Sequence, residues 1–106
     1  MKMYLSRKNG HVDAVAEYLD ASGEMVVLRG SKISENISGG KFRSARSVEN
    51  RRSEDNVKDF VVIKDMLFKS PSAAANFVTG SSTNGLVAWK TIDGKTLKSY
   101  LSETKQ

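Results

Sequence analysis

Residues 70 to 80 read SPSAAANFVTG, and they predict a helix whose two ends are both marked in the sequence. Ser70 can accept hydrogen bonds from the free amides of the first turn, and Pro71 suits the first helical position because its missing N–H group is not needed there. Gly80 suits the left-handed residue that ends many helices. We therefore expect a capped helix of about two turns, with three alanines that let another element approach closely.

The chain before this helix carries the signals of a small antiparallel sheet. Residues 3–6 form a short candidate strand, and the extended runs 12–19 and 25–28 are joined by a turn at 21–24. Apolar residues recur at every second position of 12–19, although a helical interpretation of that run is also available. We favour the strand because two extended runs that share a short loop form a hairpin. The β-branched residues of 60–63 predict a further, buried strand.

The chain after the helix adds one more short element. Residues 81–85 form a polar loop, the apolar run 86–90 is expected to place Trp89 in the core, and residues 96–101 can form a last short helix. The expected fold is α+β, with a small antiparallel sheet and two or three short helices in a single domain over residues 1–106. A chain of 106 residues supports one hydrophobic core rather than two.

Composition excludes several classes of protein. The chain has no Cys, which removes disulfides, thiolate nucleophiles and cysteine metal sites together. The polar N-terminus has no signal-peptide pattern, and no apolar run approaches the roughly 20 residues of a membrane span. We therefore expect a cytoplasmic location and no membrane partner.

The net charge of +5 is concentrated in one part of the chain. Residues 39–52 hold five basic residues against Glu49 alone, within a basic segment that we place at 39–56. This segment can be a solvated, mobile loop or can contain a short helix within 44–54. A basic patch suits nucleic acid or another acidic partner, because neutralised phosphates release their counterions.

The residues needed for catalysis or for a bound cofactor are missing. His11 is the single histidine and has no second ligand nearby for a zinc site. No glycine-rich phosphate loop, dinucleotide fingerprint or G-x-S-x-G nucleophile motif occurs. We therefore predict no catalytic residues, no metal, no cofactor and no small-molecule substrate, and we expect a protein that is not an enzyme.

Two places could bind an anion such as phosphate. The start of the 70–80 helix exposes backbone amides beside Lys69, with the hydroxyls of Ser70 and Ser72; the alternative is an ordinary cap satisfied within the chain. The loop 81–85 offers the Asn84 amide, with Lys90 close behind; the alternative is a plain turn in which Asn84 and its neighbour Gly85 are left-handed.

Four pieces of the sequence together resemble a known family. They are VVLRGS at 26–31, FKSPSAAA at 68–75, Gly80 followed by Asn84-Gly85, and WK at 89–90 followed by DGKTL at 93–97. On these pieces the chain resembles a bacterial and archaeal family of unknown function, a C-terminal domain often appended to GIY-YIG nucleases and to restriction or modification proteins. The spacing is also similar to that of the RAMA module of DNA-methylase-associated proteins.

The resemblance implies a non-catalytic accessory domain that contacts DNA, with modified DNA as one candidate, beside a nuclease or a restriction or modification partner. Two departures from the family pattern stand out. Leu86 occupies a position where Trp commonly follows Asn-Gly, and the middle segment is rich in Arg and Ser where a leucine-bearing helix is usual.

The leading hypothesis is therefore a DNA-binding domain with one contact surface and a set of added phosphate contacts. The surface consists of Lys69, Ser70, Ser72, Asn84 and Lys90, and the phosphate contacts are Arg43, Arg46, Arg51 and Arg52. The alternative is a protein-interaction or structural domain that docks on a nuclease or ATPase partner.

Overall fold

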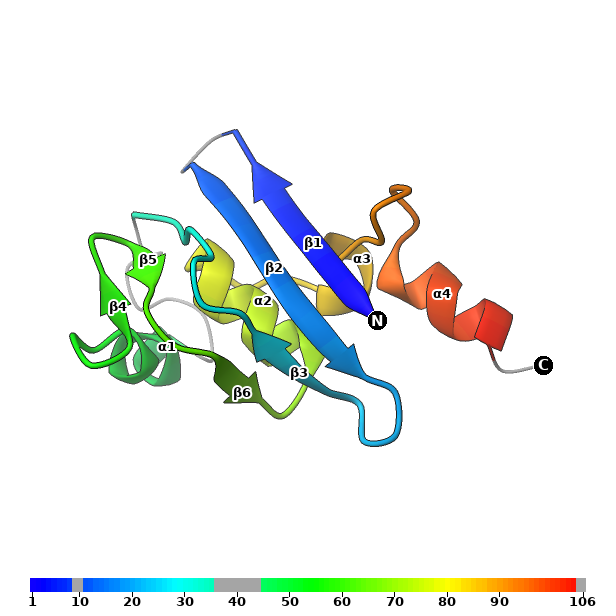
Figure 1. Cartoon of the computed structure of the whole chain (residues 1–106), viewed down its shortest axis with the longest axis horizontal. Coiled ribbons are helices and arrows are strands. Elements are labelled where there is room, and N and C mark those ends of the chain that lie inside the picture. Colours follow the sequence, from blue (N-terminus) through cyan, green and yellow to red (C-terminus); the bar gives the residue numbers. More distant parts are fainter. Residues whose placement is uncertain (9–10, 36–44, 105–106) are drawn as a thin grey trace.

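A computed structural model describes residues 1–8, 11–35 and 45–104, without the side chains of Ala45, Arg46 and Thr104. The described residues form an α+β domain, as expected, with a four-stranded antiparallel sheet in the order β1-β2-β3-β6 and a separate two-stranded sheet, β4-β5 (Figure 1). In chain order the elements are β1 (Lys2–Arg7), β2 (Val12–Leu19), β3 (Glu24–Val27), α1 (Ala45–Arg51), β4 (Val57–Lys58), β5 (Val61–Val62), β6 (Met66–Phe68), α2 (Pro71–Thr79), α3 (Gly85–Ala88) and α4 (Leu97–Thr104).

The first three strands form a meander with one buried face. Along β2 the side chains of Val12, Ala14, Ala16 and Tyr18 are buried, and those between them are partly or fully exposed. This alternation is the period of a strand with one face in the core. The β2–β3 hairpin pairs Ala16 with Val27, so the strand interpretation of residues 12–19 is confirmed.

Helix α2 covers the buried face of the sheet and is capped as the sequence predicts. Figure 1 shows α2 behind the sheet, with α1 and the β4-β5 hairpin toward one end of the molecule and α4 at the other. The Ser70 hydroxyl accepts a hydrogen bond from the Ala73 amide at 3.1 Å. Gly80 is left-handed, with φ of 72°, and its N–H group donates to the carbonyl of Asn76. Ala74 and Ala75 are fully buried against the sheet, where a small side chain lets the two layers approach.

The predicted buried strand at 60–63 is wrong in extent. Only Val61–Val62 are extended, and they pair with β4. Phe60 and Ile63 are each 41% exposed. Asp59 and Phe60 have φ of 53° and 62°, so they form the two-residue turn of a hairpin instead of a strand. Residues 66–68, in contrast, form β6 and complete the main sheet beside β3.

The C-terminal part of the chain closes the core at the β1 edge. Lys90 exchanges backbone hydrogen bonds with Tyr4, at 2.9 and 2.7 Å, and the Leu97 amide donates to the carbonyl of Trp89. Trp89 and Leu97 are both fully buried, so the core position of Trp89 and the last helix are confirmed. Among the residues that the structure describes, no helix is long and apolar enough to cross a membrane.

Candidate nucleic-acid interface

The two candidate anion sites that the sequence singled out lie against each other, and the second, the loop 81–85, leads into the start of α3. The Ser72 hydroxyl accepts a hydrogen bond from the Gly85 amide at 3.0 Å, and the Asn84 side chain accepts one from the Leu86 amide at 3.0 Å. The indole N–H of Trp89 donates to the Pro71 carbonyl. The structure thus brings Ser70, Ser72 and Asn84 together, but each of their side-chain oxygens is bonded to a backbone amide. Their geometry is that of ordinary caps satisfied within the chain.

Gly85 explains why the α2 and α3 starts can meet. A Cβ atom at this position would lie 2.2 Å from the carbonyl carbon of Pro71 and 2.4 Å from the amide nitrogen of Ser72. Asn84 has φ of −78°, and Gly85 begins α3 without a positive φ. The interpretation of these two residues as a left-handed turn is therefore wrong. Glycine is required here for close backbone approach.

Arg51 and Lys69 form a basic surface at the outer edge of β6, called the β6-edge surface below. The Arg51 guanidinium lies 4.2 Å from the centre of the Phe68 ring, and its Nη2 atom donates to the Leu67 carbonyl at 2.8 Å. Within the described part of the chain, its Nε and Nη1 atoms have no hydrogen-bond partner. Lys69 follows Phe68 and is exposed. The stacking and the single hydrogen bond hold the Arg51 charge in place while other donors remain available.

Arg52 faces the interior of the fold. Its guanidinium donates to the carbonyls of Ser34 at 2.8 Å and Phe77 at 2.7 Å, with a longer bond to Val78. Burial lowers the pKa of Arg52 to about 10, so the group is still protonated at neutral pH. Phe77 and Val78 belong to the last turn of α2, whose carbonyls have no partner inside the helix. Arg52 therefore acts as a cationic cap of α2.

Of the remaining predicted contacts, Lys90 does not join the β6-edge surface. Lys90 is exposed but pairs through its backbone with Tyr4 of β1, and the strand order puts β1 and β6 at opposite edges of the sheet. Arg46 lies on α1, and only its backbone is described. Arg43 lies outside the described residues. The single surface from Lys69 to Lys90 that the sequence suggested is thus divided between two edges of the sheet.

The structure shows a distinction between Arg51 and Arg52 that the sequence analysis missed. Successive residues of a helix point about 100° apart, so Arg51, the last residue of α1, and Arg52, which follows it, start out in different directions. That spacing is the signal that could have separated them. Among the described side chains, no group of three His, Asp or Glu residues lies close enough to hold a metal ion.

Comparison with known proteins identifies the family. The family model described as Domain of unknown function (DUF4357) matches residues 3–101, nearly the whole chain. Neither the curated proteins nor the solved structures gave a match. The expected resemblance to a family of unknown function is confirmed, whereas the association with GIY-YIG nucleases and with the RAMA module stays a prediction.

Proposed function

Because the chain belongs to the DUF4357 family of domains of unknown function, we propose its role from the geometry: a non-catalytic accessory domain that binds DNA beside a nuclease or a restriction or modification partner. The observation that carries the proposal is the β6-edge surface. There the Arg51 guanidinium is fixed over Phe68 and held by the Leu67 carbonyl, next to the exposed Lys69.

The chemistry of this surface fits phosphate groups. A guanidinium has five N–H donors in a planar fork, and the one hydrogen bond to Leu67 leaves the rest of the fork for an anion. Holding the side chain in place in the free protein reduces the entropy that binding would otherwise cost. Arg46 of the same helix and Arg43 before it are further sources of positive charge. Such contacts position a protein on the DNA backbone and carry little sequence information.

The other predicted contact residues take different parts in this proposal. Ser70, Ser72 and Asn84 fix the α2 and α3 starts, and Arg52 fixes the end of α2. Lys90, at the β1 edge, is a separate contact point for DNA that extends past one edge of the sheet. Modified DNA remains a candidate ligand through the family resemblance alone.

The test is the salt dependence of binding to a short DNA duplex, measured by fluorescence anisotropy. The unchanged protein should lose affinity steeply as salt rises, and Arg51→Ala should reduce the slope of log K against log salt by about 0.9, the value of one phosphate contact. Arg7→Ala is the matched control, because it removes the same charge from an exposed residue of β1. Equal effects of the two variants, or binding that does not depend on salt, would contradict the proposal.

A second candidate function is docking on a protein partner, such as a nuclease or an ATPase. It is favoured by the sheet face that α2 does not cover, where Leu67 is 50% exposed and pairs across the strands with Val26. Capture of the same partner after nuclease treatment, lost in Leu67→Ser and kept in Arg51→Ala, would support this function over DNA binding. The opposite pattern would exclude it.

A further inference from the structure

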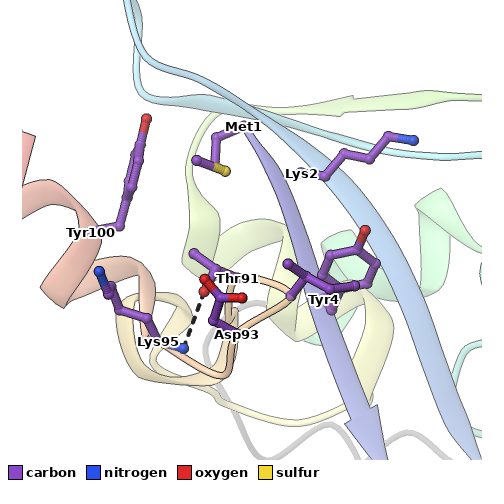
Figure 2. A pocket seen from close by; sticks show the side chains of 8 residues that line it. Met1, Lys2, Tyr4, Thr91, Asp93, Lys95 and Tyr100 are labelled. Carbon is purple, nitrogen blue, oxygen red and sulfur yellow. Dashed lines mark hydrogen bonds between the residues drawn. The ribbon is translucent and has the colours of Figure 1, made fainter.

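A pocket of about 230 Å³ lies between β1, the turn at 91–95 and α4. It is lined by Met1, Lys2, Tyr4, Thr91, Ile92, Asp93, Lys95 and Tyr100 (Figure 2). Pockets for drug-sized ligands usually have about 300 to 1,000 Å³. This one therefore has room for one planar ring, and the rest of a larger ligand would lie at its open rim. It lies at the β1 edge of the sheet, opposite the β6-edge surface.

Two tyrosines form the side walls of the pocket. In Figure 2, Tyr100 of α4 and Tyr4 of β1 lie on opposite sides, with Thr91 and Asp93 between them in this view. The Tyr100 hydroxyl donates to the Asp20 carboxylate at 2.8 Å, which holds the ring in place and raises the pKa of Tyr100. Aromatic walls favour a planar aromatic ligand, because rings gain from offset or edge-to-face contact beyond the area they bury.

The turn between the walls is held by its own hydrogen bonds. The Thr91 amide donates to the Lys95 carbonyl at 2.7 Å, and the Lys95 amide donates to the Thr91 hydroxyl at 3.1 Å. The pocket floor is thus formed before any ligand arrives. A preformed site loses less entropy on binding than one that must be ordered by the ligand.

Of the charged groups that line the pocket, two are already in ion pairs and two are available to a ligand. The Lys95 ammonium is paired with Glu103 at 2.6 Å, and the Met1 amine is paired with Glu17. The side chains of Lys2 and Asp93 have no hydrogen-bond or ion-pair partner among the described residues. One available carboxylate, Asp93, therefore lies between the aromatic walls, and one available cation, Lys2, lies at the rim with its ammonium group pointing away from Asp93 in Figure 2.

We propose that this pocket binds a nucleoside monophosphate. The base lies between Tyr4 and Tyr100, and the phosphate lies at Lys2. The Asp93 carboxylate accepts a hydrogen bond from an N–H group of the base, and the Lys2 ammonium neutralises the phosphate. The pocket does not depend on duplex binding at the β6-edge surface, so the two proposals can fail separately.

The test is an NMR titration of the whole chain with deoxycytidine monophosphate. Saturable shifts are expected at the amides of Lys2, Tyr4, Asp93, Lys95 and Tyr100. Lys2→Ala and Asp93→Ala should each weaken the affinity about threefold, the size of one exposed charge contact. Lys98→Ala is the matched control on α4, because Lys98 is exposed and does not line the pocket; it should leave the affinity unchanged.

Two further probes separate the parts of the ligand. Phenyl phosphate has a ring and a phosphate but no N–H donor, so its affinity should fall in Lys2→Ala and not in Asp93→Ala. Inorganic phosphate alone should not give saturable shifts at the pocket. Shifts from inorganic phosphate equal to those from the nucleotide, shifts confined to other residues, or equal effects of Lys2→Ala and Lys98→Ala would overturn the proposal. Arg51→Ala should leave nucleotide binding intact.

Discussion

The glycine at position 85 shows how one residue can decide whether two helices meet. Its missing side chain lets the backbone of α3 lie against Pro71, and the Ser72 hydroxyl then reaches the Gly85 amide at 3.0 Å. The contact is between backbone atoms, which cannot move aside as a flexible side chain can. Glycine is therefore needed at position 85 because the two helices pack closely there, and not because the chain turns there.

Gly85→Ala should lower the free energy of unfolding by about 3 kcal/mol, because the new methyl group would overlap the Pro71 carbonyl and force the helices apart. Urea unfolding followed by circular dichroism measures the change. Gly94→Ala is the control: nothing lies within 4 Å of a Cβ there, and φ of 87° alone should cost about 1 kcal/mol. Equal losses in the two variants would show that the contact with Pro71 does not matter.

The ends of α2 could be predicted from the sequence, whereas the contact between Gly85 and Pro71 could not. Ser70, Pro71 and Gly80 specify the ends of α2 through their own backbone preferences, so the sequence identified them. Asn84-Gly85 is compatible with a turn or with a helix start, and the choice depends on Pro71, which lies in another element. The contact with Pro71 cannot be predicted from the Asn84-Gly85 dipeptide itself.

Among the elements, the end of helix α1 is marked by two consecutive arginines with different roles, one at the surface and one in the interior. Arg51 stacks on Phe68 at the edge of the sheet, and Arg52 caps the last turn of α2. A stretch of basic residues in a sequence shows charge but not direction. The basic segment was therefore predictable as a feature, whereas the division of its arginines between surface and interior required the helix and its neighbours.

Arg52→Ala should lower the free energy of unfolding by about 2 to 3 kcal/mol, because the carbonyls of Ser34 and Phe77 lose a charged donor in a half-buried place. Arg51→Ala, one residue away, should cost at most about 1 kcal/mol, since it loses one hydrogen bond and one ring contact at the surface. Thermal unfolding of the two variants gives the comparison. A larger loss for Arg51→Ala would contradict the assigned roles and would also complicate the DNA-binding test.

At the scale of the whole molecule, the two ends of the chain are packed on each other. The backbone of Lys90 pairs with Tyr4 of β1, and Leu97 of α4 is fully buried beside Trp89. Local patterns predicted the first strand and the last helix separately. The pocket between them, lined by Tyr4 and Tyr100, could not be predicted, because no sequence pattern joins residues at opposite ends of a chain.

Leu97→Ala should lower the free energy of unfolding by about 2 to 4 kcal/mol, as expected for a large cavity in a shared core. Near-ultraviolet circular dichroism, which reports on Trp89, and far-ultraviolet circular dichroism should still show one coincident transition. Lys98→Ala, its exposed neighbour, should change stability by less than about 0.5 kcal/mol. Separate transitions for the two signals would mean that α4 folds as an independent unit.

The strand order β1-β2-β3-β6 also sets an order of assembly. The first three strands pair with near neighbours in the chain, whereas β6 reaches β3 only after the chain has closed a long loop, and pairing across a long loop is slow. We expect β6 to join last and to open first, so the amides of 66–68 should exchange with solvent faster than those of 3–5. The Arg51 guanidinium is hydrogen-bonded to the Leu67 carbonyl of this strand. A ligand bound at the β6-edge surface would therefore slow the exchange of the 66–68 amides and stabilise the strand that opens first.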